Sequence, residues 1–316
     1  MKKRQLIYIG LLAFFLTVGC TNKENNKTEM SSESHPQETT LTDALGNNVE
    51  VPGKPKRIIG SYLEDYLVAL GITPVAQWSV NDGASVQTYL QDQLTDVPMI
   101  AHDLPFEAVI GYEPDLLLMG EASTVEGGKY DQYAKIAPTY VVKSGTDTSW
   151  RDKLIEIGTV VGEKEKAEKV LTDYDQKMSE AKAAIKESTK GESAVVVWVV
   201  NNSIFMVREN SSSGAVLYNE LGLEVPNLVQ EISEKATADW SAVSLEKLAE
   251  LDADHIFLVD SDQAIGSPLL EENIWKNIPA VKKGNLYEYS PETSWLYAGP
   301  IANSEIINDV VDQLVK

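Results

Sequence analysis

Cysteine and histidine are almost missing from this chain of 316 residues. The one cysteine, Cys20, excludes an intrachain disulfide framework. The three histidines, His35, His102 and His255, have no metal-binding spacing, and a zinc or manganese site needs several convergent ligands. We therefore expect neither a metal of the protein's own nor a cofactor.

Basic residues are also scarce: 27 Lys and Arg stand against 48 Asp and Glu, for a formal net charge of −21. Nucleic-acid binding depends on basic patches, so this balance argues against a nucleic-acid partner. It does not exclude a local basic pocket.

Catalytic motifs are lacking as well. The sequence has no Gly-rich phosphate loop, no Gly-x-Ser-x-Gly and no His-Glu-x-x-His, and the serines at 211–213 have no assignable base. We therefore expect a protein that is not an enzyme. A secreted hydrolase and a cell-surface adhesin remain the alternatives from other classes.

The chain has one notable apolar run, Leu6–Val18, which follows three basic residues and is too short to span a membrane comfortably. It predicts a signal peptide over residues 1–19. The next stretch, Leu-Thr-Val-Gly-Cys20, resembles a bacterial lipoprotein cleavage site, although Thr17 stands where Leu is usual. Residues 20–40 are polar and predict a lipidated flexible tether. Signal peptide, cysteine and tether together predict a globular body held on the outer face of the cytoplasmic membrane. The alternative is an uncleaved N-terminal anchor.

Strand and helix patterns alternate through the rest of the chain, which predicts α/β lobes with mainly parallel sheets over residues 41–147 and 191–316. Predicted strands are 57–61, 74–78, 115–119, 139–142, 194–200, 204–207, 255–259 and 286–289. Predicted helices are 63–70, 129–137, 214–221, 245–251 and 302–314.

Residues 148–190 predict the connection between the lobes. Ser149 and Asp152 form a capping box that begins a first helix, which ends at Gly162. A second apolar stripe of period 3.6 then runs without Gly or Pro from Glu163 to Ser188, roughly 39 Å of helix. We expect this helix to bridge two lobes as a rigid rod; an ordinary helix within one domain is the alternative.

The two halves share a repeat. Residues 106–119 align with 245–258, and each segment has a Glu near a helix start, Glu107 or Glu246, with an Asp eight residues later and a buried strand after it. A duplicated lobe predicts a ligand cleft between the copies. Chance similarity of two helix–strand units is the alternative.

From about Leu41 onward the chain resembles the iron-siderophore and cobalamin class of substrate-binding proteins of ABC importers. The residues that carry the resemblance are Pro55-Lys-Arg-Ile-Ile59, Ala69-Leu-Gly-Ile-Thr-Pro-Val75, Glu113-Pro-Asp-Leu-Leu117 and the Gly158…Gly162-Glu163…Ala167 pattern. The resemblance implies two Rossmann-like lobes joined by one long helix, a cleft that closes little, and a monomer. It also implies that Glu107 and Glu246 pair with arginines of the membrane permease.

The resemblance further suggests which side chains hold the ligand. Trp240, Trp295 and Tyr297 resemble the cleft-wall aromatics of ferric-hydroxamate binders, and three aromatics near predicted strand ends of the first lobe add to them: Tyr62, Trp78 and Tyr89. Relatives often carry an arginine in the loop at 210–214, where this chain has serines, so Arg208 either replaces it or points to solvent. Relatives also carry a basic residue before the docking Glu of the first lobe. Here residues 101–103 offer only His102, which either donates to the ligand or is a simple surface histidine.

Few cleft cations favour a near-neutral ferric tris-hydroxamate over a highly charged tris-catecholate. The expected ligand is therefore a ferric siderophore of the hydroxamate type, with iron held by the siderophore. A ferric catecholate, cobalamin and haem stay open as alternatives. Haem would need an axial ligand such as Met206, Tyr218 or His102.

Overall fold

The structure, a computed structural model, describes residues 38–80, 85–145 and 148–315. The predicted signal peptide, the lipidation site Cys20 and the tether as far as residue 37 lie outside these residues. The predicted tether is slightly too long, because Thr39 and Thr40 already belong to β1 (Thr39–Thr42), which pairs antiparallel with β2 (Asn48–Val51). Polar β-branched threonines suit such an edge strand, where the backbone makes the contacts. No helix in the described ranges is long and apolar enough to cross a bilayer.

The first lobe, residues 38–145, is built on parallel strands. β3 (Ile58–Ser61), β6 (Leu116–Met119) and β7 (Thr139–Val141) form one sheet. β4 (Gln77–Ser79) and β5 (Met99–Ala101) form another, and a bridge between Ile59 and Ala76 joins the two. All residues of β3 and β6 are buried, as expected for strands covered on both faces. The lobe's helices are α1 (Glu64–Ala69), α2 (Gln91–Leu94), α3 (Phe106–Gly111) and α4 (Tyr130–Tyr133).

The second lobe, residues 194–315, has a mixed sheet in the order β10-β9-β8-β11-β12. Its strands are β8 (Ala194–Val200), β9 (Ser203–Val207), β10 (Trp240–Val243), β11 (His255–Asp260) and β12 (Leu286–Tyr289). β8, β11 and β12 are parallel, whereas β9 runs antiparallel to both of its neighbours, β8 and β10. The sequence pattern missed β10, because a four-residue edge strand that is mostly only half-buried has little apolar alternation.

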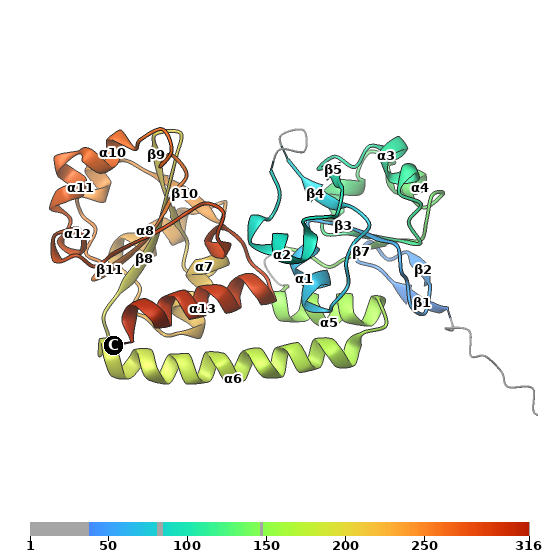
Figure 1. Ribbon diagram of the computed structural model, residues 1–316, viewed down its shortest axis with the longest axis horizontal. Helices are drawn as coiled ribbons and strands as arrows, with labels where there is room; N and C mark the ends of the chain where they lie inside the picture. Colours follow the sequence, from blue (N-terminus) through green and yellow to red (C-terminus); the bar gives the residue numbers. More distant parts are fainter. Residues whose placement is uncertain (1–37, 81–84, 146–147, 316) are drawn as a thin grey trace, which may run out of the picture. The chain divides into compact units, whose positions relative to one another are not determined.

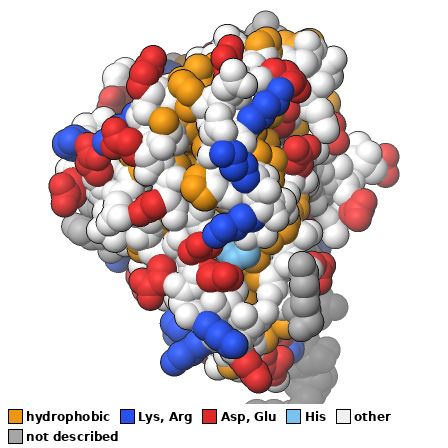
Figure 2. Space-filling view, turned by 90° about the vertical axis from the view of Figure 1, so that its left-hand side faces the viewer, with side chains coloured by type: hydrophobic (Ala, Val, Ile, Leu, Met, Phe, Trp, Pro, Cys, Tyr) orange, Lys and Arg blue, Asp and Glu red, His pale blue; other side chains and the backbone are white. Residues whose placement is uncertain are grey.

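Several helices cover this second sheet (Figure 1). They are α7 (Ser212–Ala215), α8 (Asn227–Lys235), α9 (Leu245–Leu248), α10 (Pro268–Glu271), α11 (Asn273–Asn277), α12 (Pro279–Lys283) and α13 (Pro300–Leu314). The helix predicted over 214–221 is instead α7 followed by a π-helical turn at Val216–Glu220. On the outer face of this lobe, basic and acidic side chains are interspersed with narrow apolar strips (Figure 2).

Two helices connect the lobes, α5 (Trp150–Val160) and the unbroken 26-residue α6 (Lys164–Thr189). Ser149 caps α5 as predicted, its Oγ accepting from the Asp152 N–H at 3.1 Å. The early part of α6, with Ala167, packs in the core of the first lobe, whereas Tyr174 and Ile185 pack in that of the second. This division confirms the predicted bridging helix. Contacts make Pro36–Lys316 one compact unit, so the predicted lobe boundaries stay a prediction.

α5 and α6 meet at a glycine. A Cβ on Gly158 would lie 2.7 Å from the Cβ of Ala167 and 3.2 Å from the carbonyl oxygen of Glu163. The two helix backbones therefore approach more closely here than any side chain larger than hydrogen allows.

We expect Gly158→Ala to lower the free energy of unfolding by about 1–3 kcal/mol, because the added methyl overpacks this contact. Chemical denaturation measures the change. Gly111→Ala, at the end of α3 where nothing lies within 4 Å of the added methyl, is the control. It should be neutral or stabilising by up to about 1 kcal/mol. Equal effects of the two substitutions would contradict the close contact.

Candidate ligand-binding site

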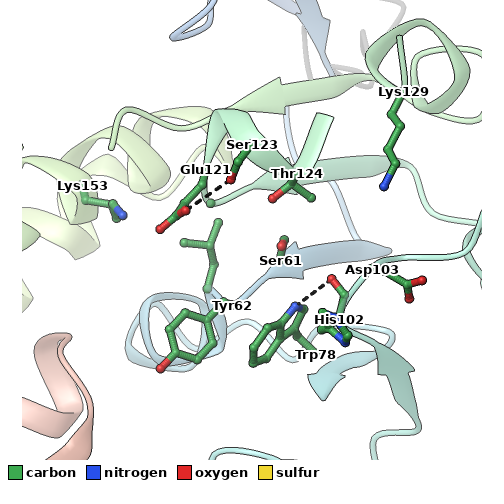
Figure 3. Close-up of a pocket in the computed structure, with 12 residues that line it drawn as sticks. Ser61, Tyr62, Trp78, His102, Asp103, Glu121, Ser123, Thr124, Lys129 and Lys153 are labelled. Carbon is green, nitrogen blue, oxygen red and sulfur yellow. Dashed lines mark hydrogen bonds between the residues drawn. The ribbon is translucent and has the colours of Figure 1, made fainter. Parts of the chain in front are cut away.

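A cavity of about 380 Å³ opens where the strands of the first lobe end (Figure 3). Ser61 is the last residue of β3, while His102 and Gly120 directly follow β5 and β6. Parallel strands bring their carboxyl ends to one edge, the usual place for a ligand in an open α/β sheet. The other lining residues are Tyr62, Leu63, Trp78, Asp103, Glu121, Ser123, Thr124, Lys129 and Lys153.

Tyr62 and Trp78 form the aromatic wall of this cavity. Their ring centroids lie 4.7 Å apart, and the Tyr62 side chain remains 46% exposed. Tyr62 has a φ of 57°, a left-handed conformation that is uncommon for an aromatic residue. The Trp78 indole N–H donates to the His102 carbonyl at 3.1 Å, and the two rings meet edge to face. The predicted residues Tyr62, Trp78 and His102 thus lie together.

The buried carboxyl of Glu64 lies behind this wall. Its Oε1 accepts from the backbone N–H of Trp78 at 2.6 Å, and its Oε2 has no partner among the described residues. Burial raises the pKa of Glu64 to about 8, although hydrogen bonds from backbone groups act in the opposite direction. Glu64 is therefore largely protonated at neutral pH and supports Trp78 without placing a charge behind the cavity.

Charged side chains at the cavity balance one another. Lys129 and Lys153 line it together with Asp103 and Glu121, and Figure 3 places each lysine toward a different end. Neither lysine is ion-paired within the part of the chain that the structure describes. From the sequence we considered only His102 in the stretch before Glu107 and did not identify these two lysines. The two lysines come from a loop and from α5, and their sequence neighbours carried no motif that indicated the cavity.

Tyr297, from the second lobe, faces the first lobe. Its ring lies 5.0 Å from that of Tyr89, and its carbonyl accepts from the Ser212 hydroxyl at 2.9 Å. Burial raises the pKa of the Tyr62 hydroxyl, and the neighbouring Tyr297 is the next cause of the rise. Tyr62, Tyr89 and Tyr297 therefore meet where the lobes approach each other, beside the cavity.

Arg208 follows β9 and is neither free in solvent nor aimed at the cavity. Its guanidinium pairs with Asp239 at 3.0 Å, and its Nε donates to the Ser211 hydroxyl at 2.5 Å. The side chain is 26% exposed. Asp239, in turn, is among the charged groups that raise the pKa of Tyr62, so the pair lies near the tyrosine group.

The two tryptophans predicted in the second lobe take different places. Trp240 is half-buried on β10, where it packs edge to face on Trp198 at 5.6 Å. Trp295 is fully buried (0% exposed), stacked 4.8 Å from Phe257, with its indole N–H donating to Asp309. The prediction that Trp295 contacts the ligand was wrong. The segment Ser294–Leu296 mixes polar and apolar residues, so its sequence did not show that Trp295 points into the core.

The repeated glutamates occupy matching positions. Glu107 and Glu246 are each the second residue of their helices, α3 and α9, and both are exposed. Neither has an ion-pair partner in residues 38–80, 85–145 or 148–315. Hydrogen bonds from its own backbone N–H and from Ser244 hold the pKa of Glu246 below its ordinary value. It is therefore a charged, unpaired surface group.

Groups that could hold a metal or a haem are limited. In the described ranges no three His, Cys, Asp or Glu side chains converge on one point. Of the three candidate haem ligands, Met206 is buried, and Tyr218 is buried with its hydroxyl donating to the Ala194 carbonyl. Only His102 reaches the cavity.

Two α/β lobes joined by one long helix, with a cavity at the strand ends of one lobe, define a substrate-binding protein. The profile of the periplasmic binding protein family matches residues 61–293, and the chain belongs to this family. It is a binding protein and not an enzyme, as predicted.

Individual relatives are similar over their whole length. The chain is 28% identical over 322 residues to the iron(3+)-hydroxamate-binding protein FhuD of Bacillus subtilis, covering all of this chain and 98% of that one. It is 26% identical to the probable siderophore-binding lipoprotein YfiY of the same organism, with 100% and 99% covered. Among solved structures, Staphylococcus aureus SirA complexed with staphyloferrin B superposes with a TM-score of 0.72 at 27% identity, covering 87% of this chain and 98% of SirA. The predicted fold class is confirmed.

The buried Glu64 predicts a pH dependence of stability. Its pKa is about 8 in the folded chain against an ordinary 4.5, so between these values the folded chain keeps a proton that the unfolded chain releases. The free energy of unfolding contributed by this group therefore falls as the pH rises, by at most about 1.4 kcal/mol per pH unit. Glu64→Gln keeps the acceptor for Trp78 and removes the titration.

Urea denaturation between about pH 5 and pH 8 should then show Glu64→Gln gaining stability relative to the unmodified protein as the pH rises. Glu107→Gln, on the surface, is the control and should follow the unmodified protein. Parallel stability curves for the unmodified protein and Glu64→Gln would show that Glu64 keeps an ordinary pKa.

Proposed function

We propose that this protein captures a ferric siderophore of the hydroxamate type and delivers it to the permease of an ABC importer. The chelate would lie between the Tyr62–Trp78 wall and Tyr297, with His102 and Tyr89 at its edges. Arg208, the predicted cation of the second lobe, would have to leave its pair with Asp239 to donate to the chelate. The protein would act as a monomer on the outer face of the cytoplasmic membrane, anchored through a lipid on Cys20.

One observation carries the ligand class: the charges around the cavity cancel. Lys129 and Lys153 stand against Asp103 and Glu121, and the buried Glu64 behind them is largely neutral. A tris-catecholate of high negative charge needs an excess of cations, because desolvated charges must be paired. A near-neutral tris-hydroxamate needs aromatic contact and a few hydrogen bonds, which this cavity offers. The FhuD relative is named for the same ligand class.

A second ligand class has specific support. SirA, a structural relative, is complexed with staphyloferrin B. The two unpaired lysines could also serve an anionic chelate of that kind, so such chelates belong in the test.

Tyr62→Ala and Trp78→Ala should each weaken binding of ferrioxamine B by about thirtyfold, or about 2 kcal/mol, because each removes an aromatic anchor. Isothermal titration calorimetry measures the affinities, and intrinsic tryptophan quenching reports contact of the chelate with Trp78. Trp78→Phe should lose most of the quenching while retaining most of the affinity. Tyr112→Ala, in the same lobe but outside the cavity, is the control and should bind normally.

The panel of chelates contains ferrichrome, ferrioxamine B, ferric staphyloferrin B and ferric enterobactin. We expect the two hydroxamates to bind tightest, with little effect of salt because little net charge is neutralised. Preference for either anionic chelate, with a steep salt dependence, would refute the hydroxamate class while the transport role remained. No binding of any chelate would refute the proposed function.

We further propose that Glu107 and Glu246 contact arginines of the permease. They are exposed, unpaired and at equivalent positions of the two lobes, and carboxylate–guanidinium pairs are strong and directional. Neither lines the cavity, so transport and ligand binding should separate on mutation.

Glu107→Ala and Glu246→Ala should each lower uptake of iron-55-labelled ferrioxamine by cells, the double variant most, with unchanged affinity in solution. Glu187→Ala, an exposed acid on α6, is the control. In the same assay, Cys20→Ser should bind the chelate but be released into the medium. Parallel loss of affinity and uptake would place the glutamates in the ligand site instead.

A further inference from the structure

Asp65 of the first lobe bonds directly to a helix of the second. Its Oδ1 accepts from the backbone N–H of Ile301 and its Oδ2 from that of Ala302, both at 2.9 Å. These N–H groups lie in the first turn of α13, where a helix has no internal acceptors and its dipole favours a negative charge. Asp65 is only 2% exposed, so water does not compete for these bonds.

Gly299 makes the approach possible. A Cβ at this position would lie 2.5 Å from both the Cγ and the Oδ1 of Asp65. Any other residue would push the start of α13 away from the carboxylate. The close fit of Gly299 against Asp65 shows that the two lobes meet here without intervening solvent.

A third hydrogen bond links Asp65 to the ligand site. The Tyr89 hydroxyl donates to Oδ2 at 2.8 Å, and the Tyr89 ring packs on Tyr297. No basic side chain pairs with Asp65 in the described ranges. The three hydrogen-bond donors therefore offset the free-energy cost of burying its carboxylate. Burial raises the pKa of Asp65, and all three bonds limit the rise.

Both ends of the contact are anchored in hydrophobic cores. In α1, the neighbours Tyr66 and Leu67 are buried in the core of the first lobe. In α13, Ile306 and Val310 are buried in that of the second. α6 is not the only link between the lobes, because Trp150 and Arg151 of α5 bond to Glu220 of the second lobe. The Asp65 contact adds a fixed point on another helix, which restricts the tilt of one lobe against the other.

We propose that Asp65 is a positioning residue that fixes the orientation of the two lobes and so holds Tyr89 and Tyr297 beside the cavity. The part that concerns ligand affinity rests on the proposed function; the part that concerns lobe orientation does not. Asp65 itself touches α13 and Tyr89, and does not line the cavity.

The test compares Asp65→Asn with a matched control, Asp262→Asn. Asp262 is likewise buried and accepts two backbone N–H groups, those of Asn201 and Asn202, but both lie within the second lobe. In each variant one carboxylate oxygen becomes an amide N–H₂, which faces a backbone N–H donor and cannot accept from it. Both variants should therefore be less stable than the unmodified protein. Only Asp65→Asn should alter the distance and orientation between the lobes.

Spin labels at the exposed positions Gln132 and Glu272, in a Cys20→Ser background of the full chain, report the distance between the lobes. We expect Asp65→Asn to broaden and lengthen the distance distribution, to speed hydrogen exchange at Ile301 and Ala302, and to weaken ferrioxamine B binding about tenfold as the competent arrangement falls to about a tenth of the population. Asp262→Asn should leave all three unchanged.

Two more variants separate the parts of the contact. Gly299→Ala keeps the carboxylate but displaces α13, and should reproduce the distance change even if Asp65→Asn fails to fold. Tyr89→Phe keeps both bonds to α13 and should leave the distance unchanged. Distances in Asp65→Asn or Gly299→Ala equal to those of the control would overturn the proposal. A distance change in a protein that binds no chelate would sustain the positioning role and refute only the proposed function.

Discussion

The apolar stripe of α6 is the constraint on which the rest of the structure depends. Its early residues are buried in the core of one lobe and its later residues in that of the other, so neither core is complete without the same helix. A helix shared in this way cannot be bent without exposing apolar surface on one side. The shared helix therefore opposes bending of one lobe against the other.

The cavity is a consequence of strand direction. Because the strands in both sheets of the first lobe are parallel, the loops after β3, β5 and β6 emerge at one edge and bring Ser61, His102 and Gly120 together. The left-handed backbone at Tyr62 then turns its ring onto Trp78. An aromatic wall with balanced charges results, and such a wall selects ligands by shape and contact area more than by charge.

The sequence indicated most of the fold because apolar periodicity and caps are local signals, as in Ser149 and the stripe of α6. It also indicated Tyr62 and Trp78, since residues at strand ends can be located from the strands themselves. It could not indicate whether an aromatic between a strand and a helix faces the cavity or the core, and Trp295, between β12 and α13, faces the core. The sequence did not predict that Lys129 and Lys153 line the cavity, because only tertiary packing brings a loop and α5 to the same place.

Two adjacent acids in α1 show why such features depend on the whole fold. Glu64 and Asp65 are both buried, yet the first bonds to Trp78 in its own lobe and the second to α13 in the other. Acids at a helix start are usually interpreted as solvated groups that favour the helix dipole. Here burial changes their roles: Glu64 supports the aromatic wall, and Asp65 forms the contact between the lobes. Because both acids lie in the six-residue α1, this one short helix bonds to the aromatic wall on one side and to the second lobe on the other.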